Sequence, residues 1–264
     1  MNWQEMAERT YERSQIPVEG KEHNPHLMGN IVWGALAAFT KVCFRSSGAG
    51  MENIRQFHNG KGAVIVCDHV SYFDPVFQYC ILRPAQWPRF MAKSDVMHGF
   101  AAWFLGMHGA FPVERDSADL SAIKRAVRYL KDGEIVALFP EGTRRGKGHV
   151  ELHLHAGAAL IARMGKVPVV PSTVHNAEKI KQKGQRLRFP KVTVEYGTPL
   201  HLKDFDWIPK PQRMDAFSWY AMRECFAMKQ GIPANHVNMQ ELFPGDEDFT
   251  ELFGDWHPGM IPPR

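Results

Sequence analysis

The sequence is poor in cysteine and has no cysteine pattern typical of a disulfide scaffold or a zinc module. Four cysteines occur in 264 residues, at positions 43, 67, 80 and 225, and no two of them form a CxxC pair. Cys67 and Cys80 stand among apolar neighbours, which favours buried, reduced thiols over a disulfide framework.

Long apolar runs are also missing. The first residues, MNWQEMAERTYERSQIP, contain no basic stretch leading into an apolar core, so we expect no secretory signal and a cytoplasmic protein. A membrane span needs about 20 mostly apolar residues. Residues 27–44 are interrupted by Asn30, Thr40 and Lys41, and residues 100–111 are too short. We expect both stretches to be buried or interfacial helices.

Charge of either sign is not in large excess. The net charge is +4, the pI is near 8.8, and hydrophobic and charged residues make up 44% and 23% of the chain. Such values are typical of an ordinary globular protein of one large or two small domains. The mild basic excess suits an anionic membrane or a phosphorylated substrate without requiring either.

Several motifs of other protein classes are absent. No GxSxG is present, so Ser71 is not a nucleophile elbow, and GTRRGKG lacks the spacing of a P-loop. HVELHLH brings His149, His153 and His155 together, but no supporting ligand spacing completes a metal site. The basic stretch KIKQKGQRLRFPK, residues 179–191, lacks a nucleic-acid-binding fold motif and is read as a solvated loop or one facing anionic lipid. We expect no metal and no nucleic acid.

What the sequence does contain is an alternation of strand and helix patterns. Short β-favouring runs alternate with helical periods of 3.6 residues, which predicts an α/β fold: a single domain with a mostly parallel central sheet flanked by helices. The predicted strands lie within residues 64–67, 89–95, 109–116, 134–143, 167–175 and 188–197, and the predicted helices within 74–82, 117–133 and 156–165.

The two ends of the chain differ from this pattern. Residues 1–60 are predicted to form an N-terminal helical, membrane-associating segment, and residues 61–240 the central domain. Residues 241–264 are acidic and rich in proline and glycine, and we expect an irregular C-terminal tail.

The stretch VIVCDHVSYFDPVF, residues 64–77, places a histidine and an acid at the end of a predicted strand. In α/β sheets ligands gather at the carboxyl ends of strands. A turn there can bring Asp74 against one imidazole nitrogen of His69 and leave the other as a base. A plainer reading is equally open from this stretch alone, because an aspartate directly before Pro75 is a good helix N-cap.

A second polar cluster follows the strand at residues 134–139. LFPEGTRRGKG presents Glu141, Gly142, Thr143, Arg144 and Arg145 after an apolar run. Guanidinium groups match phosphate oxygens in bidentate fashion, which favours recognition of an anionic group over a solvated turn.

Four blocks, HVSYFD, GAFPVERD, FPEGTR and VPVVP, occur in this order over residues 60–200. Together they resemble the blocks of the glycerolipid acyltransferases with a His-x4-Asp motif, specifically the 1-acylglycerol-3-phosphate acyltransferase family. The resemblance implies that His69 is the general base and that Asp74 orients it. It implies acceptor binding by Arg115, Glu141, Gly142 and Arg144.

Thr143 lies within the same block, and Lys93 stands where many members carry a basic residue, so both are also predicted to bind substrate. The resemblance implies no cofactor. Acyl-CoA or acyl carrier protein would serve as the acyl-donor substrate, and a lysophospholipid as the acceptor.

The chain departs from the family where Asp68 replaces the asparagine that commonly precedes the histidine. A second carboxylate there is expected to raise the pKa of His69 or alter acceptor choice. The leading interpretation is an enzyme that converts 1-acylglycerol 3-phosphate to phosphatidic acid, peripheral at the cytoplasmic face of the cell membrane. The alternatives are acylation of another lipid hydroxyl (a lyso-aminolipid or a glycolipid precursor) and a non-catalytic lipid-binding membrane protein.

Overall fold

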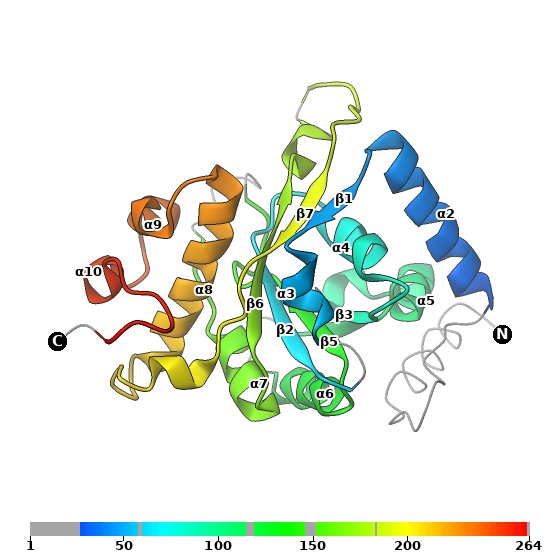
Figure 1. Ribbon diagram of the computed structural model, residues 1–264. Helices are drawn as coiled ribbons and strands as arrows, with labels where there is room; N and C mark the ends of the chain where they lie inside the picture. Colours follow the sequence, from blue (N-terminus) through cyan, green and yellow to red (C-terminus); the bar gives the residue numbers. More distant parts are fainter. Residues whose placement is uncertain (1–26, 58–59, 115–118, 146–151, 183, 263–264) are drawn as a thin grey trace.

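The computed structural model describes residues 27–57, 60–114, 119–145, 152–182 and 184–262. Within these ranges the chain forms one sheet covered by helices on both faces (Figure 1). The strands are β1 Ser47–Ala49, β2 Ala63–Cys67, β3 Pro88–Lys93, β4 Ala110–Val113, β5 Ile135–Leu138, β6 Val169–His175 and β7 Thr193–Tyr196.

The helices are α2 Leu27–Cys43, α3 Met51–Arg55, α4 Asp74–Leu82, α5 Gly99–Met107, α6 Leu120–Lys131, α7 Gly157–Gly165, α8 Arg213–Gln230, α9 Met239–Leu242 and α10 Thr250–Phe253. Short 3-10 turns occur at Ser94–Val96, Ala177–Lys179, Leu202–Phe205 and Ala234–His236. Figure 1 shows α8, α9 and α10 on one side of the sheet, and α2, α4 and α5 on the other.

The sheet is mostly parallel, as predicted. Its strand order is β1-β7-β6-β2-β5-β3-β4, and the five strands from β6 to β4 are parallel to one another. β7 runs antiparallel to β6 and pairs in parallel with β1. The carboxyl ends of β2 and β5 therefore lie side by side at one edge, which is where the predicted polar blocks begin.

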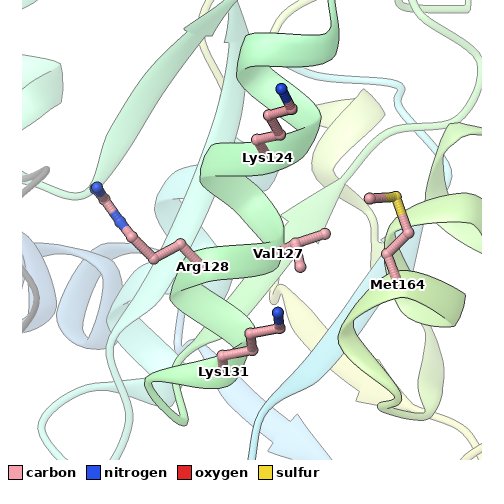
Figure 2. A pocket seen from close by; sticks show the side chains of 5 residues that line it. All are labelled: Lys124, Val127, Arg128, Lys131 and Met164. Atoms are coloured by element: carbon pink, nitrogen blue, oxygen red, sulfur yellow. The ribbon is translucent and has the colours of Figure 1, made fainter.

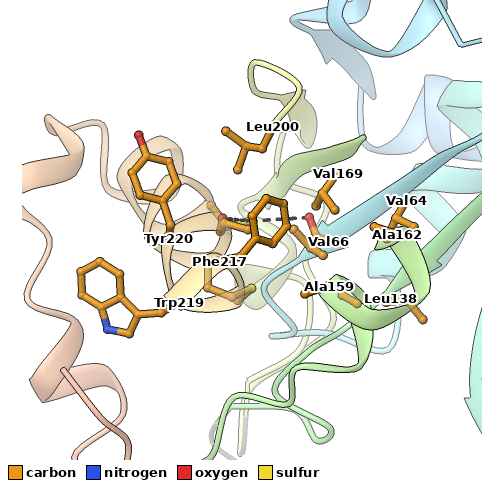
Figure 3. Close-up of a cluster of buried hydrophobic side chains, with 14 of the residues drawn as sticks. Val64, Val66, Leu138, Ala159, Ala162, Val169, Leu200, Phe217, Trp219 and Tyr220 are labelled. Atoms are coloured by element: carbon orange, nitrogen blue, oxygen red, sulfur yellow. Dashed lines mark hydrogen bonds between the residues drawn. The ribbon is translucent and has the colours of Figure 1, made fainter. Parts of the chain in front are cut away.

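Side chains of β2 alternate between two buried clusters. Val64 and Val66 face the cluster that includes α6, α7 and α8, whereas Ala63, Ile65 and Cys67 face the cluster on the α4 side. Figure 3 shows the first cluster, in which Phe217 of α8 lies beside Val66 of β2. A strand buried on both faces reads as a continuous apolar run, which explains the sequence of β2.

Most predicted elements are confirmed, α4 over the predicted residues and the others within a few positions of the expected bounds. All four cysteines are free, and Cys67, Cys80 and Cys225 are buried. No helix among the described residues is long and apolar enough to cross a membrane.

The structure extends the sheet beyond the predicted central domain. β1 lies within the segment predicted to be N-terminal and helical, yet it pairs with β7 through Ser47, Gly48 and Ala49. Three residues with this composition carry no strand pattern of their own, so the pairing with β7 supplies the structure.

The C-terminal residues consist largely of turns and two one-turn helices, and they are part of the fold. Phe243, Phe249, Phe253 and Trp256 are buried in the α8-side cluster. Phe253 stacks on Trp219 of α8 with ring centroids 5.7 Å apart. This segment completes the core on the α8 face.

Replacing Phe253 with alanine should therefore cost about 3–5 kcal/mol of unfolding free energy, because it deletes a fully buried aromatic ring. The measurement is urea unfolding at equilibrium. Ile261→Ala is the control, since Ile261 is 91% exposed in the same tail, and it should change stability by less than about 0.5 kcal/mol. Equal, small effects of both substitutions would show that the tail is not part of the core.

Candidate active site

His69, in the loop after β2, meets Asp74, the first residue of α4. Nδ1 of His69 lies 3.0 Å from Oδ2 of Asp74. The same oxygen accepts hydrogen bonds from the backbone N–H groups of Val70, at 2.9 Å, and Ser71, at 2.8 Å. The side chain of Asp74 is fully buried, so the loop is folded around its carboxylate.

These contacts separate the two readings of Asp74. The N-cap of α4 is Phe73, and Asp74 is already in the helix, where Pro75 fits the first turn. An N-cap carboxylate accepts from the second or third helical N–H. Asp74 instead accepts from residues before the helix and from the imidazole, so its position suits orienting His69.

The imidazole of His69 is held on a second side by Phe139. The two rings stack with centroids 4.2 Å apart, and the His69 side chain is 16% exposed. A carboxylate at Nδ1 favours the tautomer with the proton on Nδ1 and leaves Nε2 to accept a proton. His69 is thus a partly accessible base with a fixed ring orientation.

The PEGTR turn after β5 packs directly on this loop, as the two neighbouring strand ends require. Oε1 of Glu141 accepts a hydrogen bond from the His69 backbone N–H at 3.1 Å, and Oε2 lies 2.7 Å from Nε of Arg145. The backbone N–H of Arg145 donates to the His69 carbonyl at 2.8 Å. Glu141, predicted with the substrate-binding residues, has a fully buried side chain and makes these polar contacts within the chain.

Burial also changes the acidity of Glu141. Loss of hydration raises the pKa of its carboxyl group from 4.5 to about 7, even though the Arg145 charge and the His69 N–H act in the opposite direction. Burial therefore favours the protonated form of this acid beside the His69 loop more strongly than water does.

Gly142 allows the turn to form. Its φ is +66°, and a Cβ at this position would lie 3.0 Å from Nε2 of His155. Its N–H donates to the Phe139 carbonyl at 3.0 Å, and the N–H of Thr143 donates to the Glu141 carbonyl at 2.7 Å. A glycine meets both the backbone and the space requirement.

Arg144 lies beside the His69 loop. Its guanidinium carbon is 3.2 Å from the centroid of the Tyr72 ring, and Tyr72 is 72% exposed. The two predicted blocks therefore meet at a surface that a phosphorylated acceptor could reach. A guanidinium stacked on an aromatic ring keeps its N–H edge for an anion.

The other residues predicted to bind substrate are less directly connected to the surface formed by Arg144 and Tyr72. Lys93 ends β3, two strands away from β2, and forms an ion pair with Asp95. Arg115 lies outside the described residues. The roles of Lys93, Gly142 and Thr143 in substrate binding stay predictions.

Asp68 was expected to act on His69, but its carboxylate lies near Lys229 and Cys67. Its Oδ2 lies 3.7 Å from Nζ of Lys229 on α8, and the Cys67 thiol lies 3.8 Å from its Oδ1. Because Cys67 faces the α4 side, the alternation of the strand directs Asp68 to the α8 side. Burial raises the pKa of Asp68, and the Lys229 charge opposes that shift.

The histidines of the HVELHLH stretch make separate contacts. His153 pairs with Asp246 at 2.7 Å, His155 abuts Gly142, and His149 lies outside the described residues. Among the described residues no group of three His, Cys, Asp or Glu side chains could hold a metal ion. The absence of a metal cofactor stays a prediction.

A basic depression lies elsewhere on the surface, between α6 and α7 (Figure 2). Lys124, Val127, Arg128 and Lys131 of α6 and Met164 of α7 line it. It shares no residue with the His69 site.

Two contributors to the site were not predicted from the sequence. Phe139 was read only as the last residue of an apolar strand, and Arg145 only as a second phosphate-binding guanidinium beside Arg144. The structure places Phe139 against the His69 ring and turns Arg145 inward toward Glu141. The sequence signal for Arg145 was its pairing with Arg144, but that signal does not distinguish outward from inward side chains.

Glu141→Gln should change how stability depends on pH. Between pH 4.5 and about 7 the folded state holds the Glu141 proton more strongly than the unfolded state does. The resulting stabilisation is fully present below pH 4.5 and is lost as the pH rises to about 7. The unfolding free energy of the wild-type protein, relative to Glu141→Gln, should fall by about 3 kcal/mol across this window, at about 1.4 kcal/mol per pH unit. Urea unfolding at several pH values measures the difference. Parallel curves for the two proteins would contradict the raised pKa.

Comparison with known proteins places this geometry in a family. The model of the Acyltransferase family matches residues 48–175. The 1-acyl-sn-glycerol-3-phosphate acyltransferase of Bacillus subtilis (strain 168) is 34% identical over 158 residues, which cover 60% of this chain and 76% of that protein. The enzyme of the same name from Streptococcus pneumoniae is 32% identical over 143 residues, 53% of this chain and 51% of that protein.

A solved structure agrees with the fold. The crystal structure of the 1-acyl-sn-glycerophosphate (LPA) acyltransferase PlsC from Thermotoga maritima aligns with a TM-score of 0.56 and 21% identity, over 86% of this chain and 90% of that chain. At this identity the likeness shows the fold alone. With the His-x4-Asp geometry and the sequence relatives, the conclusion is that the chain belongs to the glycerolipid acyltransferase family that includes the 1-acyl-sn-glycerol-3-phosphate acyltransferases.

Proposed function

We propose that the chain transfers a fatty acyl group from a thioester donor to the free hydroxyl of 1-acylglycerol 3-phosphate, giving phosphatidic acid. The observation that carries this proposal is the contact of His69 with Asp74 beside Arg144, a base next to a phosphate-binding group. The names of the relatives support the acceptor. The ordered His69–Asp74 pair argues against a lipid-binding protein without catalysis.

The reaction follows from the ring orientation. Nε2 of His69 takes the proton of the acceptor hydroxyl as its oxygen attacks the thioester carbonyl. The resulting imidazolium is stabilised by the Asp74 carboxylate at Nδ1. Collapse of the tetrahedral intermediate breaks the C–S bond, and the thiolate takes the proton back from His69. An ester and a free thiol result, and no acyl-enzyme is formed.

The acceptor phosphate is assigned to Arg144, with Arg115 as the second predicted ligand. Arg144 can use the N–H edge of its fork on the phosphate while its face rests on Tyr72. Lys93, Gly142 and Thr143 are proposed to complete the acceptor site. The acyl donor is acyl-CoA or acyl carrier protein, and no further cofactor is required by this chemistry.

We further propose that the enzyme works at an anionic membrane surface, on the cytoplasmic face, without spanning it. Apolar side chains of α2 and α5 are exposed, among them Ile31 at 63%, Val42 at 75% and Phe100 at 52%. Lys41 lies on the same helix, and such apolar and cationic combinations favour interfacial binding. Trp103, expected at this surface from the sequence, is half-buried and packs against the α4-side cluster.

The loop between β6 and β7 adds to this surface. Leu187 and Phe189 are exposed at 50% and 46%, and Phe189 packs on Phe44, just after α2, with ring centroids 5.2 Å apart. Arg45 donates to the Phe189 carbonyl at 2.8 Å. The basic loop and the end of α2 are thereby joined, which supports the interpretation of residues 179–191 as facing anionic lipid.

Activity of the purified chain with 1-acylglycerol 3-phosphate and acyl-CoA tests the proposed reaction. His69→Ala should lower kcat by at least ~10²–10⁴-fold, the usual contribution of general-base catalysis, in a protein of unchanged circular dichroism. His236→Ala, a change of an exposed histidine outside the site, should keep wild-type kcat. Faster turnover of a lyso-aminolipid or glycolipid acceptor would reassign the substrate, and near-normal turnover by His69→Ala would remove the mechanism.

Membrane binding is tested by sedimentation with anionic liposomes. The protein should pellet with them, less so at high salt, and Val42→Glu or Phe100→Glu should reduce the bound fraction, because each places a charge in the apolar contact. Ile261→Glu introduces the same charge at an exposed residue of the C-terminal tail, across the molecule from α2 in Figure 1. Equal binding of all three variants would reject this surface.

A further inference from the structure

Arg145 differs from its neighbour Arg144 in pointing into the fold. Its guanidinium carbon lies 4.6 Å from the ring centroids of both Phe226 on α8 and Phe243 after α9. Its two terminal nitrogens lie 3.3 and 3.5 Å from the Leu242 carbonyl. A cation enclosed in this way needs specific partners, because its hydration has been removed.

One of those partners belongs to the catalytic region. Nε of Arg145 lies 2.7 Å from Oε2 of Glu141, whose other oxygen accepts the His69 N–H. The backbone N–H of Arg145 donates to the His69 carbonyl. Both backbone polar groups of the catalytic histidine are therefore bonded to residues of a single turn.

The contacts form a continuous series from the C-terminal segment to the catalytic base. Leu242 and Phe243 hold the Arg145 guanidinium, Arg145 holds Glu141, and Glu141 with the Arg145 backbone holds His69. Two of the links join segments far apart in sequence, Leu242 with Arg145 and Glu141 with His69, and the Arg145–Glu141 contact connects them within one turn.

We propose that Arg145 is a positioning residue that transmits the placement of the C-terminal segment, residues 239–243, to His69. This inference rests on the proposed function, since it assigns a role in the same reaction. Arg145 touches no reacting atom. Without its guanidinium, Glu141 loses its cation, the turn loosens, and the two hydrogen bonds that hold the His69 backbone are less firmly positioned.

The role of the C-terminal segment follows from the same geometry. Phe243 is almost fully buried and packs on Phe226 at 5.9 Å as well as on Arg145. The segment thus has a catalytic consequence although no residue of it contacts His69 in the contacts described. A displacement of about 1 Å at a catalytic group can cost about 100-fold in rate.

The first experiment compares Arg145→Met with Arg144→Met in the full chain. Methionine keeps much of the apolar stem between Phe226 and Phe243 but removes the charge and the N–H donors. Arg145→Met should lower kcat about 10- to 100-fold with the KM for 1-acylglycerol 3-phosphate within about twofold. Arg144→Met should instead raise that KM. An unchanged kcat in folded Arg145→Met overturns the proposal.

A second pair of variants separates positioning from stability. Phe243→Ala removes a buried ring of the C-terminal segment, and Phe249→Ala removes a buried ring just beyond it, which packs on Trp219 and not on Arg145. Both should lower Tm, whereas only Phe243→Ala should reduce kcat per folded molecule. Equal kcat values for the two variants would show that the segment acts on stability alone.

Hydrogen exchange provides a readout that does not require turnover. In Arg145→Met the amides of residues 69–71 should exchange faster than in the wild type, while strand β2 keeps its protection. Arg145→Lys, the milder substitution, should give a smaller change in the same residues. An inactive wild-type protein would reject the proposed function, whereas unchanged exchange at residues 69–71 would reject the positioning role.

Discussion

The side chain of Asp74 is fully buried at the carboxyl end of the sheet, and a carboxylate in that position must be surrounded by donors. Its Oδ2 receives three of them, from the backbone of Val70 and Ser71 and from the ring of His69. The three hydrogen bonds to this oxygen hold the bend of the chain after β2 at the start of α4, and they fix the orientation of the imidazole. The His69–Asp74 contact and the local fold thus have the same cause.

Neighbouring residues of similar chemistry serve different purposes because the chain sends them in opposite directions. Asp68 continues the alternation of β2 toward Lys229 on the α8 side, while His69 turns to Asp74. Arg144 lies over Tyr72 at the surface, while Arg145 enters the fold. The inward-facing charges are paired within the fold, whereas the guanidinium of Arg144 stacks on the exposed ring of Tyr72.

The sequence was sufficient to predict the elements with a strong local pattern and the blocks at their ends. β2 was found from its continuous run of apolar, β-favouring residues, α4 from Pro75 at its start, and α6 from its 3.6-residue apolar period and Gly133 at its end. α8 was not predicted, because it is buried over much of its circumference and has no clear amphipathic stripe.

The candidate site likewise has features that the sequence predicted and features that it did not. The proximity of His69, Asp74 and Glu141 followed from adjacent strand ends. The inward direction of Arg145 and the stacking of Phe139 depend on tertiary packing that no local pattern encodes. The coupling to Phe243 could not be predicted, since the two segments are nearly a hundred positions apart, as the Arg145–Leu242 separation of 97 shows.

Phe253 and Trp256 share a buried cluster with Val66 of β2, and this affects the order in which the chain folds during synthesis. Val66 contacts Cys225 across 159 positions, and Phe253 and Trp256 complete the cluster that Val66 shares. Contacts so distant in sequence form late, because a long loop must close first. On the ribosome, β2 and the loop with His69 are made before α8 and the aromatic residues that follow it. A nascent chain therefore exposes an apolar face of β2 until α8 and these aromatic residues have been synthesised, and His69 is held in place only after that.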